Sequence, residues 1–209
     1  TWKDAMPAKP ARPSRGPLSL RVVLDDDSGF DLTGMGTQRK LAVYVVNDPS
    51  EIAMVSTLGP DPLADSFDSD ALAAILAKAG RAQLKGVLRD QRVIAGIGNA
   101  YSDEILHAAK LSPFKPSNAL TPDEHERLFR AIKDELGDAI ERSVGRAAKE
   151  LKGEKKIGLR VHGRTGEPCD VCGTTIAEVS FADSSLQYCP GCQTGGKPLA
   201  DRRMSKLLK

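Results

Sequence analysis

The pattern of hydrophobic and polar residues changes its period once along this 209-residue chain, near Asp68. Ahead of that point lie two short apolar runs, LSLRVVL at 18–24 and LAVYVV at 41–46, with an acidic turn at 25–29 between them. Such runs, bounded by Gly and Asp, are typical of strands, and residues 30–32 can add a third short one. Two or three strands of this size are marginal in isolation, so we interpret them as part of a larger sheet.

After Asp68 the apolar residues recur with a helical period. The pattern predicts four helices, over residues 69–79, 81–91, 99–109 and 122–144. Ser69 or Asp70 can cap the first of them. Thr121 with Glu124 predicts a capping box at the start of the last. That last helix carries an apolar stripe that we expect to be core: Leu128, Ile132, Leu136 and Ile140.

Two closely spaced glycines precede the third helix in the sequence AGIGN, with Gly98 directly before Asn99. A tight turn of this kind exposes backbone N–H groups at a helix N-terminus, where they bind phosphate, and an Asn side chain can add a donor. The alternative is an ordinary turn between helices, with Asn99 as its cap.

The four cysteines of the chain form two pairs, Cys169-x2-Cys172 and Cys189-x2-Cys192, sixteen residues apart. Four thiolates around one centre make a closed tetrahedral zinc site, and the spacer suits a β-hairpin, 175–181 and 186–188 around a turn at 182–185. The alternatives are two disulfides, or an iron–sulfur or redox role. Paired spacing in a chain without an apolar targeting segment favours zinc.

The charge is distributed unevenly, although the formal net charge is only +2. Residues 1–80 carry 8 basic and 11 acidic side chains, whereas residues 81–209 carry 22 and 17. Residues 145–167 are basic and poor in apolar side chains, which fits either a polyanion partner or a solvated linker. No run of eighteen apolar residues is present, which excludes a membrane-spanning helix.

Two motifs resemble those of one family, in the order that family has them. LKGVLRDQRVIAGIGNAYSDEIL at 84–106 resembles the helix–two-turn–helix of the formamidopyrimidine-DNA glycosylase/endonuclease VIII family, and EPCDVCG with YCPGCQ resembles its zinc finger. The resemblance covers about residues 80–195 and is nearest to an actinobacterial branch. It implies an α+β fold with three parts: 1–62, remnant of an N-terminal β-sandwich catalytic domain; 68–150, helix–two-turn–helix domain; 151–209, linker, zinc finger and basic tail.

The resemblance also implies roles for particular residues. Lys85, Gly98 and Asn99 match the family positions that grip phosphates beside a DNA lesion. Arg39 falls where the family fills the gap left by a flipped-out nucleotide. Leu41 matches the accompanying wedge, or is a strand-core leucine. Cys169, Cys172, Cys189 and Cys192 match the zinc ligands.

The sequence departs from the family at the catalytic positions. The family's nucleophile is an N-terminal proline followed by glutamate, whereas this chain begins Thr1-Trp2, so we expect it to start inside the family's first domain and assign no catalytic residue. Ser184 stands where the family carries an arginine at the hairpin tip. The segment 152–159 is too short for the loop that some members close over 8-oxoguanine, which favours oxidised pyrimidines or abasic sites.

Three hypotheses follow from the resemblance. The first is part of a base-excision-repair DNA glycosylase and abasic-site lyase for oxidised bases, with its nucleophile outside the chain. The second is a catalytically silent module that binds damaged DNA. The third is a protein- or RNA-binding module. The first two imply a bacterial cytoplasmic, nucleoid-associated monomer that holds Zn²⁺ and binds duplex DNA with oxidised bases or abasic sites, without a membrane.

Overall fold

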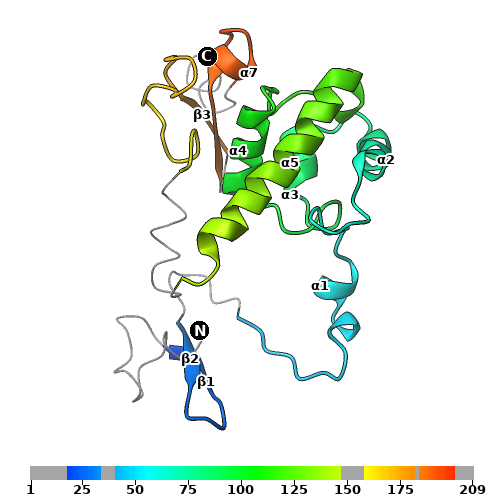
Figure 1. The fold of residues 1–209 in the computed structure, drawn as a ribbon, viewed down its shortest axis with the longest axis vertical. Helices are drawn as coiled ribbons and strands as arrows, with labels where there is room; N and C mark the ends of the chain where they lie inside the picture. The colour runs from blue at the N-terminus through cyan, green and yellow to red at the C-terminus, as the bar shows by residue number, and fades with distance from the viewer. Residues whose placement is uncertain (1–17, 34–40, 147–157, 182–183, 201–209) are drawn as a thin grey trace. The chain divides into compact units, whose positions relative to one another are not determined.

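The computed structural model describes residues 18–33, 41–146, 158–181 and 184–200. The chain divides into two compact units, one made of residues 1–56 with 143–154 and the other of 57–142 with 155–209. Helices and antiparallel strand pairs occur together, as Figure 1 shows, which confirms the predicted α+β class. Within the described residues, no helix has the length and apolar composition needed to cross a bilayer.

The described residues of the first unit form an antiparallel strand pair, β1 (Leu18–Val23) with β2 (Gly29–Thr33). The predicted short strand at 30–32 is therefore confirmed as the centre of β2. Across the pair, Arg21 donates from Nε and Nη2 to the two carboxylate oxygens of Asp31, each at 2.7 Å. Further along lie a 3-10 turn, η2 (Pro49–Glu51), and a short helix, α1 (Ala53–Ser56).

The strand predicted at 41–46 is absent, so that prediction is wrong. Within the described residues this segment pairs with no other strand, and Val45 is 98% exposed. Strand propensity reflects the fit of a side chain to a pleated, half-buried surface, and this segment has no such surface. Leu41 is 52% exposed and is not a strand-core leucine.

The second unit is built around four helices and a short turn: α2 (Ser69–Ala79), α3 (Leu84–Arg89), α4 (Asn99–Ala108), η3 (Ser117–Ala119) and α5 (Pro122–Ser143). The four predicted helices are all present. Their apolar faces meet in one buried cluster that includes Leu72, Leu88, Ile105 and Ile132. Burial of this apolar surface is the main force that holds the helices together.

The helix ends follow local chemistry, with two corrections. The N-cap of α2 is Asp68, not Ser69 or Asp70: its Oδ1 accepts from the Ala71 N–H at 2.8 Å. At the start of α5 the capping box is confirmed, because the Glu124 N–H donates to Thr121 Oγ1 and the Thr121 N–H donates to Glu124 Oε2.

Tertiary contacts shorten one helix and expose the end of another. α3 is shorter than its predicted span of 81–91, because Gln83 pairs in a β-bridge with Pro116 just before the helix begins. The apolar stripe of α5 was expected to be core along its whole length, and this is wrong at Ile140. Its side chain is 50% exposed, because the helix extends beyond the buried cluster.

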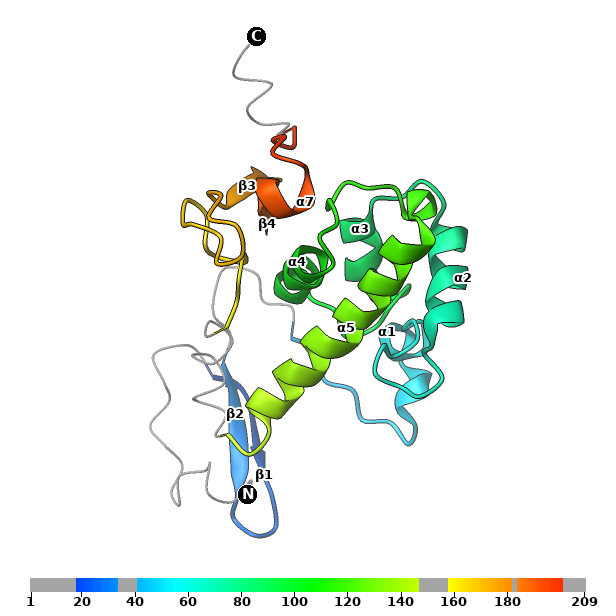
Figure 2. The same ribbon diagram turned by 45° about the horizontal axis from the view of Figure 1, so that its top comes forward.

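The zinc-finger segment belongs to the same unit and forms the predicted hairpin, β3 (Ala177–Ser180) with β4 (Ser185–Tyr188), followed by a helical turn, α7 (Pro190–Gln193). Residues 182 and 183 of the predicted turn lie outside the described residues. Both β4 and α7 contact α4, and Figure 2 shows α4 beside them.

Candidate metal centre and nucleic-acid interface

The first cysteine pair is shaped by a tight turn of its own backbone. The Cys169 N–H donates to Thr174 O at 2.9 Å, and the Gly173 N–H donates back to Cys169 O at 2.8 Å. Gly173 has φ +72°, a left-handed conformation that favours glycine. The turn therefore points the thiols of Cys169 and Cys172 toward one place.

The second pair is held at the start of α7. Cys189 is the N-cap, and its Sγ accepts from the Cys192 N–H at 3.4 Å. Buried Gln193 accepts from the Cys189 N–H at 2.8 Å and donates to Leu111 O at 2.9 Å, which ties this pair to the helical core. A Cβ at Gly191 would lie 2.9 Å from Cys172 Sγ, so the two pairs approach too closely for a larger residue.

The four thiols converge without forming disulfides. Cys169 Sγ lies 3.9 Å from Cys192 Sγ, and Cys172 Sγ lies 3.3 Å from Cys189 Sγ. All four cysteines are free. In a tetrahedron with Zn–S bonds of about 2.3 Å the sulfur atoms lie about 3.8 Å apart. The separations fit a four-thiolate zinc site, and they contradict the two-disulfide alternative, in which bonded sulfurs lie about 2 Å apart.

The thiols of Cys172, Cys189 and Cys192 differ in their tendency to ionise. Hydrogen bonds from Thr174 lower the pKa of the Cys172 thiol to about 6, so this group is ready to coordinate. Burial raises the pKa of the Cys189 and Cys192 thiols. A divalent cation offsets that cost, because its charge favours deprotonation of a coordinating thiol.

The turn before α4 is held by one glutamine. Gln91 accepts from the Gly96 N–H at 2.8 Å and donates to the Ile97 carbonyl at 2.8 Å. Gly96 has φ +83°, which a glycine adopts without strain. The N-cap of α4 is Gly98, and no side chain of the described residues caps its N–H groups. An open helix N-terminus of this kind is a ready anion site.

Asn99 connects that N-terminus to the zinc hairpin. It is the first residue of α4 rather than its cap, and its Nδ2 donates to the carbonyl of Ser185 at 2.9 Å. Ser185 opens β4, next to Ser184, which is partly buried and carries no charge. The structure therefore brings Gly98 and Asn99 beside the turn end of the hairpin, although 86 residues separate Asn99 from Ser185.

Lys85 is buried, with its side chain only 7% exposed. Its Nζ donates to Asp103 Oδ1 at 2.6 Å and to the Asn99 carbonyl at 2.8 Å. Burial lowers the pKa of Lys85, and the Asp103 carboxylate opposes that shift. The other oxygen of Asp103 lies 2.8 Å from His162 Nδ1. Lys85 thus joins α3 to the start of α4, and its contact with a phosphate stays a prediction.

Sequence reasoning did not single out Asp103 and Glu104, and both are buried. The Glu104 carboxylate accepts the backbone N–H groups of three consecutive residues, 160, 161 and 162, at 2.7–3.0 Å. It thereby fixes the segment that leads into the zinc finger against α4. The only sequence signal is a pair of adjacent acids in a helix, which usually indicates an exposed face.

The remaining predicted residues fall elsewhere. Arg39 lies outside the described residues.

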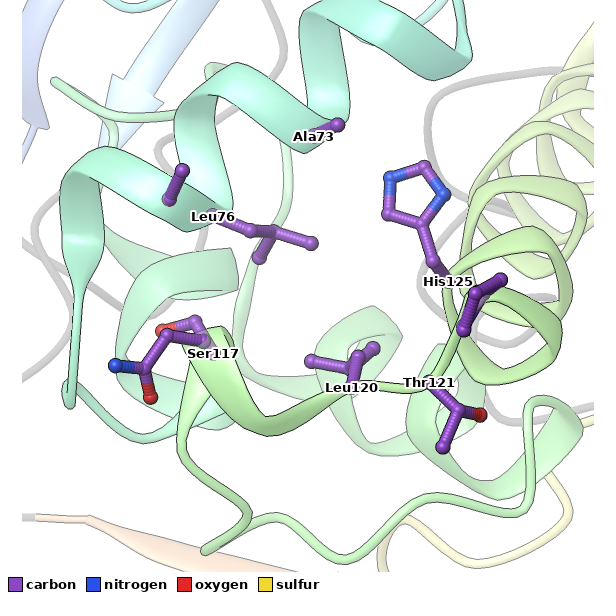
Figure 3. Close-up of a pocket in the computed structure, with 9 residues that line it drawn as sticks. Ala73, Leu76, Ser117, Leu120, Thr121 and His125 are labelled. Carbon is purple, nitrogen blue, oxygen red and sulfur yellow. The ribbon is translucent and has the colours of Figure 1, made fainter.

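A cavity of about 320 Å³ lies between α2, η3 and the start of α5, and Figure 3 shows Leu76, Leu120 and His125 around it. His125 is the single titratable side chain among its lining residues, so the cavity lacks a paired acid and base.

Two family models match the chain in the order expected. Residues 58–150 match the formamidopyrimidine-DNA glycosylase H2TH domain, and residues 166–195 match the zinc finger found in FPG and IleRS. The second match contains all four cysteines, and with the converging thiols it fits zinc binding by this segment. This confirms the predicted cofactor.

Curated relatives match over different shares of their length. An uncharacterized formamidopyrimidine-DNA glycosylase-like protein of Mycobacterium tuberculosis is 60% identical, over 73% of this chain and 94% of its own. The formamidopyrimidine-DNA glycosylase of Herpetosiphon aurantiacus is 39% identical over 82% of this chain and 64% of its own. The chain therefore spans under two thirds of that glycosylase.

Solved structures agree with the sequence matches. The MutM (Fpg) protein of Thermus thermophilus superposes with a TM-score of 0.71 at 30% identity, over 90% of this chain and 71% of that protein. Lactococcus lactis Fpg bound to DNA containing an abasic site superposes with a TM-score of 0.60 at 32% identity, over 68% and 52%. With a curated relative matched over nearly its whole length, these findings show that the chain belongs to the formamidopyrimidine-DNA glycosylase family.

Proposed function

We propose that this chain binds damaged duplex DNA, with abasic sites or oxidised bases, through the N-terminus of α4 and the zinc hairpin. The observation that carries the proposal is the open N-terminus of α4 at Gly98 and Asn99, held directly beside the turn end of the hairpin. Uncapped N–H groups attract phosphate oxygens, and a fixed hairpin beside them gives the site a second contact surface.

Charge and relatives support the same proposal. Residues 81–209 hold 22 of the 30 lysines and arginines. Structural neighbours include MutM in complex with DNA containing carbocyclic 8-oxo-G and Lactococcus lactis Fpg in complex with DNA containing FAPY-dG. Base excision and abasic-site lyase chemistry are proposed for the protein as a whole, and this chain is proposed to bind the DNA at the lesion.

Lys85, whose amine contacts the Asn99 carbonyl at the turn, does not act as a nucleophile in this proposal. Lys85 is buried, and its Nζ donates to Asp103 Oδ1 and to the Asn99 carbonyl, so the amine is held inside the fold and is not free to attack the sugar. A Schiff base requires a neutral amine in reach of the sugar C1′. We therefore expect this chain to bind an abasic site without forming a covalent adduct.

DNA binding is tested by fluorescence anisotropy with a duplex that carries a stable abasic analogue and with the matched intact duplex, over a range of salt concentrations. Asn99→Ala should weaken binding to the abasic duplex by about 1–3 kcal/mol, or about 5- to 150-fold. Asn118→Ala is the matched control, because Asn118 is exposed in η3, away from the turn. Equal affinity of the wild-type chain for both duplexes would contradict the proposal and favour a different partner.

The hairpin contact is tested by adding charge. Ser184→Arg should strengthen binding to the abasic duplex, because a guanidinium there would meet a phosphate. Ser66→Arg adds the same charge at an exposed position before α2 and should change binding less. An equal gain from both variants would mean that only net charge matters.

Covalent chemistry is tested separately by borohydride trapping of the 209-residue chain on abasic-site DNA. The expected result is no covalent adduct. A trapped adduct would place a nucleophile in this chain and remove the silent-module alternative.

A further inference from the structure

A buried histidine lies against the zinc site from outside the finger. His107 is in the last turn of α4 and is 3% exposed. Its Nε2 lies 3.4 Å from Cys169 Sγ. The candidate ligand atoms of His107, Cys169, Cys189 and Cys192 all lie within 4.8 Å of one another. Figures 1 and 2 both show α4 alongside the finger.

We propose that His107 is an outer-sphere partner of the zinc, whose Nε2–H donates a hydrogen bond to the metal-bound thiolate of Cys169. A coordinated thiolate has no proton, so it can only accept. The proton must therefore reside on Nε2 of the imidazole. His107 Nδ1 is buried with no hydrogen-bond partner among the described residues, so the opposite tautomer would leave a buried N–H unpaired.

Two of the other three thiols, Cys172 and Cys189, contrast with Cys169 in the origin of their donors. Cys189 Sγ accepts from the Cys192 N–H, and Cys172 is hydrogen-bonded by Thr174, so both use donors from the finger itself. Zinc with four thiolates carries a net negative charge, which N–H donors around the sulfurs stabilise. Cys169 receives such a donor from α4.

Four thiolates already complete a tetrahedral set, which leaves His107 as a fifth group outside it. α4 is then tied to the finger near both of its ends, by Asn99 to Ser185 at the start and by His107 to Cys169 in the last turn. Metal affinity should consequently depend on α4. This inference rests on the zinc site and not on the proposed DNA binding.

The experiment compares zinc affinity of the full chain with two variants, by competition with a chelator at fixed pH. His107→Phe keeps a ring of similar size but removes the donor, and it should weaken zinc binding about tenfold or more. His107→Gln places an amide N–H near the position of Nε2 and should recover most of that loss. Circular dichroism checks that the helices of each variant are formed.

Two measurements on the zinc-loaded wild-type chain separate the alternatives. X-ray absorption should give four sulfur ligands and no nitrogen, and ¹⁵N NMR of the histidine rings should give the Nε2–H tautomer for His107. A nitrogen ligand, the Nδ1–H tautomer, unchanged affinity in His107→Phe, or equal losses in both variants would overturn the proposal. If His107→Phe does not fold, the tautomer alone decides.

Discussion

The helical region and the zinc finger of the second unit are stabilised in different ways. Among the described residues, sixteen buried apolar side chains between Phe67 and Leu136 form one cluster, which is a hydrophobic core of ordinary composition. The finger has two small clusters, and the buried members of one of them are Val161, Cys169, Ile176 and Cys189. The helices are held by burial of apolar surface and the finger by its metal, since so few buried side chains rarely stabilise a fold alone.

The largest effect should come from the metal ligands. Cys189→Ser should release zinc and unfold the β3–β4 hairpin while α2 to α5 stay folded, because structural zinc contributes about 10–16 kcal/mol of apparent binding free energy. Zinc content and amide NMR spectra measure both parts. A chelator added to the wild-type chain should give the same spectrum, and stoichiometric zinc retained in the variant would contradict the four-thiolate site.

A cavity in the helical core should destabilise the helices and leave zinc bound to the finger. Ile132→Ala should lower the free energy of unfolding of the helices by about 2–5 kcal/mol, because the buried side chain leaves a void. Ile132→Val, the matched control, should cost about 0.5–1.5 kcal/mol. Chemical denaturation gives both values. Loss of zinc in the Ala variant under native conditions would show that the two regions do not fold separately.

The next largest effect should come from the contact between Glu104 of α4 and the backbone of residues 160–162. Glu104→Gln replaces one carboxylate oxygen by an NH2 group that faces the Arg160 N–H, and it should cost about 1.5–3 kcal/mol, as for a lost hydrogen bond to a charged group. Glu126→Gln, on an exposed pair with Arg130, should stay within about 0.5 kcal/mol. Hydrogen exchange at 160–162 locates the effect, and unchanged protection there would contradict the assigned role of Glu104.

A helix cap should have the smallest effect. Asp68→Ala should destabilise the helical region by about 1 kcal/mol, because the Ala71 N–H loses its acceptor. Asp65→Ala, at an exposed position just before, should change the free energy of unfolding by less than about 0.5 kcal/mol. Thermal denaturation compares the two variants, and equal effects would contradict the capping role of Asp68.

Local signals in the sequence predicted much of this architecture. Three of these signals are short-range: the two close pairs of cysteines, the Thr121 capping box and the helical period after Asp68. Each depends on interactions between residues a few positions apart. The predicted strand at 41–46 and the predicted burial of Ile140 were wrong because neither property is local. Strand pairing and burial depend on what lies opposite, which no local pattern contains.

By itself, the sequence determined the helices, the zinc cofactor and the family. Only the tertiary structure decided that Asp103, Glu104 and His107, in a helix with no unusual pattern, turn toward the finger and are buried there. It also decided that Lys85 pairs with Asp103 and that Asn99 donates a hydrogen bond to the hairpin. The physical reason is that a polar side chain is buried only where another segment supplies its partner, and that segment lies far along the chain.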